Sequence, residues 1–188
     1  GSNTYIFGGG GTTTLTFNSA SGGRFFFAPP SGYKALSVPN MTASVITQPK
    51  QYFDILTYIG SSTTQTLGGL LFQPDLTWLK ATSTVADNGL FDSIRAATNV
   101  LISNKTNAEA ASSTSLTAFT TSGFTLGPWG AFSNPATSTP SGAVPNGGYI
   151  SWNWKKSPTS GFDIATYTGN NTADRAISHS LGAAPDIV

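Results

Sequence analysis

The stretch YISWNWK, residues 149–155, decides the fold class of this 188-residue chain. Apolar and polar side chains alternate along it, so that Ile150, Trp152 and Trp154 would point to one side of an extended strand. The serine, asparagine and lysine between them would point to the other side. A period of two is typical of a half-buried β-strand. We therefore expect a sheet with a hydrophobic core face that receives the isoleucine and the two tryptophans.

Similar short runs recur along the chain between turn-forming residues, while helical periodicity is almost absent. This pattern is typical of a sandwich or a barrel. We expect a central strand in LTWLKA (76–81) and a hairpin in SLTAFTTSGFTLG (115–127), and the spacing of apolar residues over 89–98 would suit one short helix. The sequence predicts strands near 12–17, 24–28, 52–58, 76–81, 100–103, 115–120, 123–126, 149–154 and 162–167. The predicted fold is an all-β antiparallel sandwich.

An internal repeat is the second feature of the sequence. FDILTYIG at residues 53–60 returns as FDIATYTG at 162–169, and nine positions agree when the later Thr and Pro-Asp matches are included. A period from Phe53 to Phe162 indicates whole structural units rather than the rungs of a solenoid. We expect three parts: closing strands of a preceding unit or an N-terminal extension over 1–50, the main sandwich over 51–160, and the start of a following repeat or closing strands of the same sandwich over 161–188.

The composition excludes several classes of partner. Charged residues make up 9% of the chain, against roughly 25% in an average globular protein, and the formal net charge is +1. Without a basic stripe we expect no nucleic acid, and without an apolar run of about 20 residues we expect no membrane insertion. The absence of cysteine removes disulfides and thiolate chemistry. Packing and strand pairing must therefore stabilise the fold.

Residues that could carry catalysis are few. Glycoside hydrolysis needs two facing carboxylates, and Glu109 with Asp87 or Asp92 is the pair that could be considered. His179 has no evident partner for a catalytic triad. Asp87, Asn88 and Asp92 could offer oxygens to calcium, but their spacing is not that of a calcium-binding loop. We expect no catalytic residue, no cofactor and no bound metal.

The aromatic residues suggest a binding surface in one place. Strand alternation favours the core for Trp78, Trp152 and Trp154. Trp129 lies between turn residues in LGPWGAF, and we expect it to be the most exposed tryptophan. Trp129 and Tyr149 are therefore the candidate glycan-binding residues, because aromatic rings stack on sugars when polar groups lie beside them.

Several motifs together carry a resemblance to a known family. RFFFAPPSGYKALSVPNM (24–41) leads into YFDILTYIG, and FQPDLTWLK, NKTNAEAASSTSLTAFTTSGFTLG and GGYISWNWKKS follow in order. This set resembles tailed-bacteriophage virion proteins of tails, fibres and appendages that are built from SPRY-like or concanavalin A-like β-sandwich repeats. The resemblance implies a jelly-roll type of sandwich and a location in the extracellular particle. It carries over no catalytic residue.

The resemblance also sets the expected function and partners. We expect a non-catalytic structural or adhesive module of a bacteriophage virion, acting in host attachment or as a building block. Its expected partners are other copies of itself in a homo-oligomer or other virion proteins, with a host cell-surface glycan as a further candidate. The first alternative is a carbohydrate-binding module for host surface glycans. The second is a glycan depolymerase, which would need Glu109 and an aspartate about 5 to 9.5 Å apart.

Overall fold

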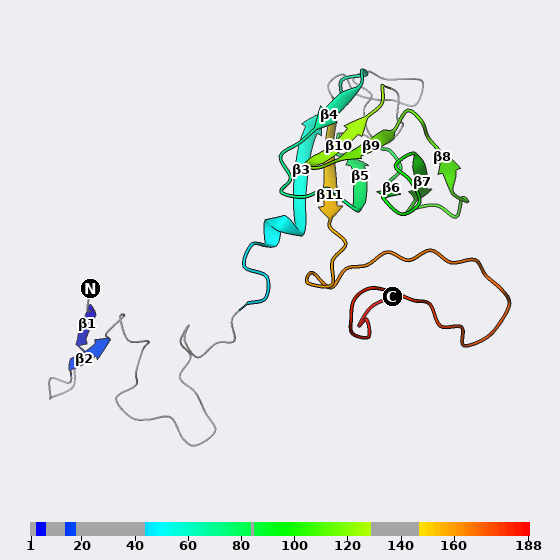
Figure 1. The fold of residues 1–188 in the computed structure, drawn as a ribbon. Helices are drawn as coiled ribbons and strands as arrows, with labels where there is room; N and C mark the ends of the chain where they lie inside the picture. The colour runs from blue at the N-terminus through cyan, green and yellow to red at the C-terminus, as the bar shows by residue number, and fades with distance from the viewer. Residues whose placement is uncertain (1–2, 7–13, 18–43, 84, 129–146) are drawn as a thin grey trace. The chain divides into compact units, whose positions relative to one another are not determined.

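The structure is a computed structural model of the chain (Figure 1). It describes residues 3–6, 14–17, 44–83, 85–128 and 147–188. The chain divides into two compact units, Gly1–Val45 and Ile46–Val188. In the first unit, β1 (Asn3–Ile6) pairs antiparallel with β2 (Thr14–Phe17), in agreement with the strand expected near 12–17. The strand expected at 24–28 lies outside the described residues.

The second unit is an antiparallel β-sandwich. Its six-stranded sheet has the order β3-β11-β5-β6-β7-β8, and its three-stranded sheet has the order β4-β10-β9. The described helical structure is one 3-10 turn, η3 (Pro49–Gln51). The strands are β3 (Phe53–Ile59), β4 (Gln65–Leu67), β5 (Leu76–Ala81), β6 (Gly89–Asp92), β7 (Asn99–Ile102), β8 (Ala110–Ala111), β9 (Leu116–Thr120), β10 (Gly123–Leu126) and β11 (Gly148–Trp154). The all-β sandwich predicted from the sequence is confirmed.

Two of the sequence expectations about elements are wrong. The segment 89–98 contains no α-helix: its first half is β6, which pairs with β5 and places Phe91 in the core, and its second half is a turn. The segment 162–167 forms no strand, and only one isolated bridge joins Ser157 to Phe162. Strand β11 already pairs with β3 on one side and β5 on the other, so the segment that follows it cannot pair with it as a further strand.

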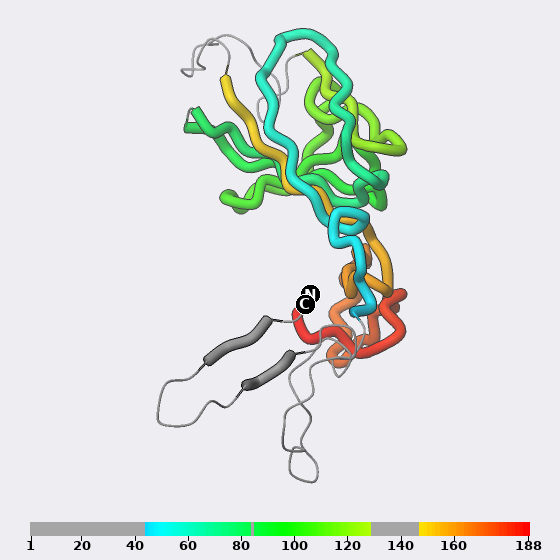
Figure 2. The backbone as a smooth tube through the Cα atoms, turned by 90° about the vertical axis from the view of Figure 1, so that its left-hand side faces the viewer, coloured from blue at the N-terminus to red at the C-terminus, as the bar shows by residue number. Residues whose placement is uncertain are grey.

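Strand β11 organises the six-stranded sheet. It lies between β3 and β5 and pairs antiparallel with both, and Figure 2 shows it running beside β3. The register places Trp152 opposite Ile55 of β3 and opposite Trp78 of β5. The expected central position of β5 is also confirmed, because β11 and β6 flank it. These pairings fix which side chains share a face of the sheet.

The core face of β11 is the opposite of the one predicted. Tyr149, Ser151 and Asn153 are buried, whereas the isoleucine and the two tryptophans between them are only partly buried. The polar side chains are tolerated inside because they bond to one another. Asn153 Oδ1 accepts from Thr77 Oγ1 at 3.0 Å, and its Nδ2 donates to Ser151 Oγ at 3.0 Å and to the Asp54 carbonyl at 3.2 Å. A satisfied buried amide avoids the cost of an unpaired one.

Hydrophobic side chains from both sheets fill the space between them. The fully buried members include Leu79 and Phe91 of the large sheet and Phe124 of the small one. Tyr58 and Tyr149 stack at 5.4 Å, and burial, with a smaller contribution from Tyr149, raises the pKa of the Tyr58 hydroxyl well above its usual value. Each such side chain contributes roughly 1.5 to 3 kcal/mol when it is fully buried.

Asp75 joins the ends of three strands. Its Oδ1 accepts from Ser93 Oγ at 2.7 Å, next to the end of β6. Its Oδ2 accepts from the backbone N–H of Lys156 at 2.7 Å, and its own N–H donates to the carbonyl of Trp154 at 2.8 Å. Hydrogen bonds to a charged group are stronger than neutral ones, so this carboxylate anchors the chain as it leaves β11.

Gly123 marks a close approach of β10 to β4, which yields a stability prediction. A Cβ at this position would lie 1.9 Å from the carbonyl oxygen of Leu67. We expect Gly123→Ala to lower the free energy of unfolding by about 1 to 3 kcal/mol in urea titrations, because backbone must shift to make room. In the matched control Gly68→Ala the nearest atom would be at 3.6 Å, and stability should not fall. Equal stability of the Gly123 variant and the wild type would contradict this packing.

Candidate functional site

One face of the six-stranded sheet points away from the small sheet, and we call it the outer sheet face. The inner residues of the same strands pack against β9 and β10, so the alternate residues point outward. The ten apolar residues of the outer sheet face are Phe53, Ile55 and Ile59 of β3, Leu76 and Trp78 of β5, Leu90 of β6, Leu101 of β7, and Ile150, Trp152 and Trp154 of β11. Thr57, Lys80, Asp92 and Asn99 lie on the same side of the sheet, around these residues.

Cross-strand register gathers five of these residues into one row that runs across five strands. Each member lies directly opposite the next in the pairing of neighbouring strands. The row reads Ile55, Trp152, Trp78, Leu90 and Leu101. Directly opposite side chains on a sheet are close enough to contact one another. The row is therefore a continuous apolar band across the sheet.

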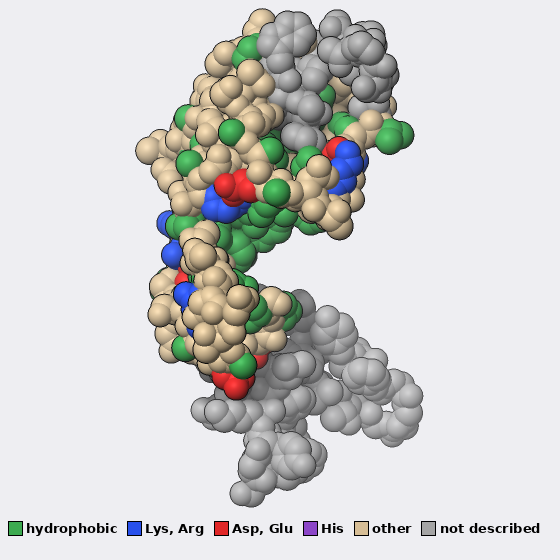
Figure 3. Space-filling view, turned by 90° about the vertical axis from the view of Figure 1, so that its right-hand side faces the viewer, with side chains coloured by type: hydrophobic (Ala, Val, Ile, Leu, Met, Phe, Trp, Pro, Cys, Tyr) green, Lys and Arg blue, Asp and Glu red, His purple; other side chains and the backbone are tan. Residues whose placement is uncertain are grey.

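Water reaches much of the outer sheet face. Ile59 is 55% exposed, Ile55 43%, and Phe53 and Leu101 37% each, while the three tryptophans are partly buried. Few charged side chains interrupt the side of the sandwich drawn in Figure 3, and hydrophobic side chains gather along its underside. Exposed apolar side chains in a continuous group mark a site of interaction more often than single ones do.

Aromatic contacts hold the outer sheet face in place. Trp78 and Trp152 have ring centroids 5.5 Å apart, and Phe53 and Trp154 have centroids 5.1 Å apart. Phe162, from the second copy of the repeat, lies 6.3 Å from Trp154. Tilted aromatic pairs of this kind contribute roughly 0.5 to 1.5 kcal/mol beyond the area they bury. These contacts between neighbouring rings hold the aromatic side chains of the face in position within the isolated chain.

Of the two candidate glycan-binding residues, the structure describes Tyr149, which points into the core and not to the outer sheet face. Tyr149 is only 3% exposed and stacks on Tyr58 in the core, so the expectation that it is an exposed ring for a sugar is wrong. Trp129 lies outside the described residues. Among the described residues, the partly exposed tryptophans are Trp152 and Trp154 of β11 with Trp78 of β5, which the sequence placed in the core. The sequence-based prediction missed that the side chains of Ser151 and Asn153 can form a hydrogen bond with each other, which allows both to be buried in the core.

Two of the candidate catalytic carboxylates meet at one guanidinium. Arg95 Nε lies 2.6 Å from Asp92 Oδ2, and Arg95 Nη1 lies 2.7 Å from Glu109 Oε2. Asp92 Oδ1 also accepts from the backbone N–H of Ile94 and of Arg95 at 3.0 and 2.8 Å. Arg95 and Glu109, with residues 165–167, line an open hollow. The arrangement ties the turn after β6 to the segment before β8, and both carboxylates are engaged in ion pairs.

The oxygens considered for calcium do not converge. Asp87 lies before β6 and Asp92 ends it, so the two carboxylates are at opposite ends of the strand. The Lys105 ammonium at 2.6 Å, followed by the Asn104 amide at 2.9 Å, lowers the pKa of the Asp87 carboxyl. Among the described residues no three His, Cys, Asp or Glu side chains gather as a metal site would need. His179 is exposed.

The two copies of the repeat start alike and then differ. In the first, Asp54 Oδ1 accepts from the N–H of Ile55 at 2.9 Å, and in the second, Asp163 Oδ1 accepts from the N–H of Ile164 at 2.7 Å. The tyrosine four residues after each aspartate is 9% exposed in the first copy and 67% exposed in the second, where it is Tyr167. The second copy therefore repeats the hydrogen bond at the start of β3, but it does not pair with a strand as β3 pairs with β11.

The geometry defines a class of protein: an antiparallel β-sandwich with one covered and one open apolar sheet face. Residues 48–188, most of the chain, match the family described as Domain of unknown function (DUF7483), and the chain belongs to this family. No curated protein and no solved structure matches it. In the part of the chain that the structure describes, no helix is long and apolar enough to cross a membrane.

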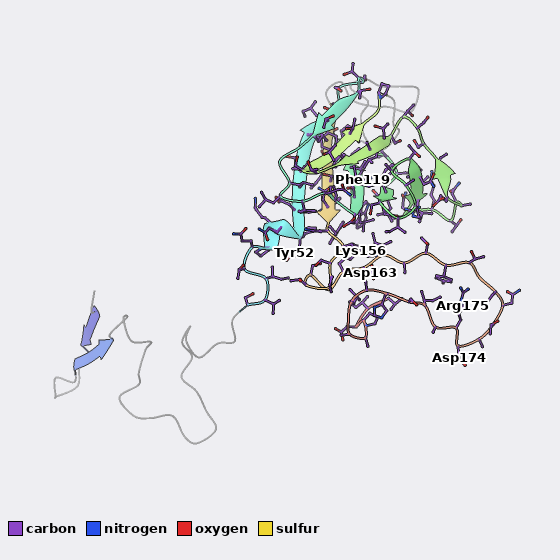
Figure 4. All side chains as sticks on the ribbon, viewed as in Figure 1. Tyr52, Phe119, Lys156, Asp163, Asp174 and Arg175 are labelled. Carbon is purple, nitrogen blue, oxygen red and sulfur yellow. The ribbon has the colours of Figure 1, made fainter. Side chains whose placement is uncertain are left out.

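Asp163 gives a prediction about pH. The Lys156 ammonium at 2.8 Å, followed by the backbone N–H of Ser180, holds the pKa of the Asp163 carboxyl far below its usual value (Figure 4). Because the pKa is lower in the folded chain than the ~3.9 of an unfolded one, the stabilisation is complete above about pH 5 and is lost as the pH falls below 4. We expect the hydrogen-exchange protection factor of the Ser180 amide to fall between pH 5 and pH 2.

The variant Asp163→Asn is the control for this titration. It should leave the Ser180 amide weakly protected at every pH in that range, since no carboxylate remains to be protonated. NMR-detected exchange, corrected for the intrinsic rate at each pH, measures both proteins. A protection factor that stays constant with pH in the wild type, or that is the same in the variant, would contradict the role of Asp163.

Proposed function

We propose that the chain is a non-catalytic structural or adhesive module of a bacteriophage virion, in a tail, fibre or appendage, and that it works by binding other proteins. The observation that carries this proposal is the outer sheet face, with its apolar row of five residues in register. The location in an extracellular particle follows from the resemblance of its motifs to virion proteins.

Three of the motifs that carry the resemblance contain strands of the sandwich, whereas the motif at 24–41 lies outside the described residues. FQPDLTWLK contains most of β5, GGYISWNWKKS contains β11, and the long Thr-rich motif contains the β9–β10 hairpin. The resemblance therefore rests in part on segments that build the two sheets and the outer sheet face. This supports the use of the domain as a building block, because a sheet face that is covered only after assembly is typical of assembly subunits.

The two alternatives are less well supported. A carbohydrate-binding site needs polar groups around its aromatic rings, and the outer sheet face surrounds Trp152 mainly with Ile55 and Trp78. A depolymerase needs an acid and a second carboxylate free to act, and Glu109 and Asp92 are both held by Arg95. The apolar row is therefore better suited to contact with a protein surface than to sugar binding, and the engaged carboxylates do not support glycan hydrolysis.

Mass in solution tests the proposed function. We expect light scattering to find a discrete oligomer or an assembly that grows with protein concentration, and negative-stain images to show a regular particle. Because the face is apolar, the association should persist when salt is raised to about 1 M, where the screening length is about 3 Å. A monomer at all accessible concentrations would contradict the proposal, and an assembly that salt dissolves would contradict an apolar contact.

A further inference from the structure

Resting on the proposed function, we propose that the outer sheet face is an interface between two copies of this chain, which pack face to face about a two-fold axis. The proposed function states only that the chain binds other proteins; here the partner is a second copy of the chain and the contact surface is the outer sheet face. It stands on the register, exposure and charge of the ten residues of that face.

The chemistry of the face fits a second copy of itself. The central row contains two tryptophans flanked by isoleucine and leucine, and it has no charged member. The nearest charged groups on the same strands are occupied: Lys80 Nζ donates to the carbonyl of Ala86, and Asp92 pairs with Arg95. A neutral apolar surface has no charge for a charged partner to match. Its complement is another neutral apolar surface, and a two-fold axis supplies one from the same residues.

The apolar area of the outer sheet face is somewhat smaller than one side of a standard dimer interface. The four most exposed members offer roughly 350 Å², taking about 200 Å² for a fully exposed large apolar side chain. With the six partly buried members, the face reaches roughly 500 to 700 Å², against about 800 Å² per partner in a standard interface. Contact around the rim would supply the remainder. The patch also equals or exceeds the largest found on a typical monomer, which is roughly 300 to 600 Å².

The proposed face-to-face packing of two copies resembles the packing of the two sheets inside each sandwich. On its inner side the six-stranded sheet packs against a second antiparallel sheet, and two such sheets pack about 10 Å apart at about 30°. On its outer side the same strands present a second apolar surface with rings fixed by aromatic contacts. Two outer sheet faces can therefore pack as the inner ones do, without a change in the fold.

A sugar is the competing occupant, and the face gives it few partners. Sugar hydroxyls require hydrogen-bonding side chains close to the stacked ring. Next to the central row, the outward-facing residues with polar groups are Thr57 of β3, Lys80 of β5, Asp92 of β6 and Asn99 of β7. Three of the four are already engaged: Lys80 and Asn99 donate to carbonyls and Asp92 pairs with Arg95. Trp78 and Trp152 are inclined by 50° to each other, so they do not form one flat platform. These features favour a protein surface.

Charge insertion at the two ends of the row tests the interface. We expect Ile55→Asp and, separately, Leu101→Asp to weaken dimerisation at least tenfold in sedimentation equilibrium, because each places a carboxylate in an apolar contact. Both side chains are well exposed in the isolated chain and lie on different strands, so both variants should fold. Far-UV circular dichroism and thermal unfolding verify this. The matched control is Leu71→Asp, an equally drastic change at a 62% exposed loop residue, which should dimerise as the wild type does.

The outcomes separate this inference from the proposed function. A wild type that is monomeric throughout overturns both. A wild type that associates, together with folded Ile55 and Leu101 variants that associate equally well, overturns only the outer sheet face as the contact. A monomer whose tryptophan fluorescence responds to purified bacterial surface polysaccharide in the wild type but not in Ile55→Asp would assign the face to a sugar and overturn the inference.

Discussion

The buried amide of Asn153 is the constraint on which the rest of the structure depends. It accepts from Thr77 on β5 and donates to Ser151 on its own strand and to the Asp54 carbonyl on β3. Because successive side chains of a strand alternate between faces, a slip of β11 by one residue would turn this amide to solvent and break all of these bonds. Its burial fixes the register of three strands at once, and with it the residues that form the core and the residues that form the outer sheet face.

Much of the fold could be predicted from the sequence, because strand period and turn residues are local signals. The bounds of β5 and β10 and the hairpin that β10 forms with β9 agree with the prediction. The face of β11 could not be predicted, because hydrophobicity alone assigns Trp152 and Trp154 to the core. Which residues are buried depends on hydrogen bonds to Thr77 and Asp54, which are about 76 and 99 residues away in the chain. The segment 89–98 was misassigned for the same reason, since pairing with β5 outweighed helical spacing.

The candidate site shows the same division between local and distant information. The sequence indicated Trp129 and Tyr149 as aromatic binding residues, but Tyr149 belongs to the core, and the aromatic surface that water reaches among the described residues lies on the opposite face of β11. Arg95, which brings Asp92 and Glu109 together, had no signal of its own, because an ion pair across 14 residues follows from the loop between β7 and β8. The two copies of the internal repeat are alike in sequence but differ in environment: Tyr58 is stacked in the core and Tyr167 is exposed.

Side-chain footprinting with a small radical probe, on protein diluted until it is monomeric, tests most directly the claim that β11 faces inward with Tyr149 and Asn153. The account predicts that Tyr58 and Tyr149 are protected while Phe53 and Ile55 are modified, and that both Phe53 and Ile55 become protected when the protein associates. The reverse pattern in the monomer, with Tyr149 modified and Phe53 and Trp152 protected, would contradict the account, because it would mean that the sheet buries its tryptophan face.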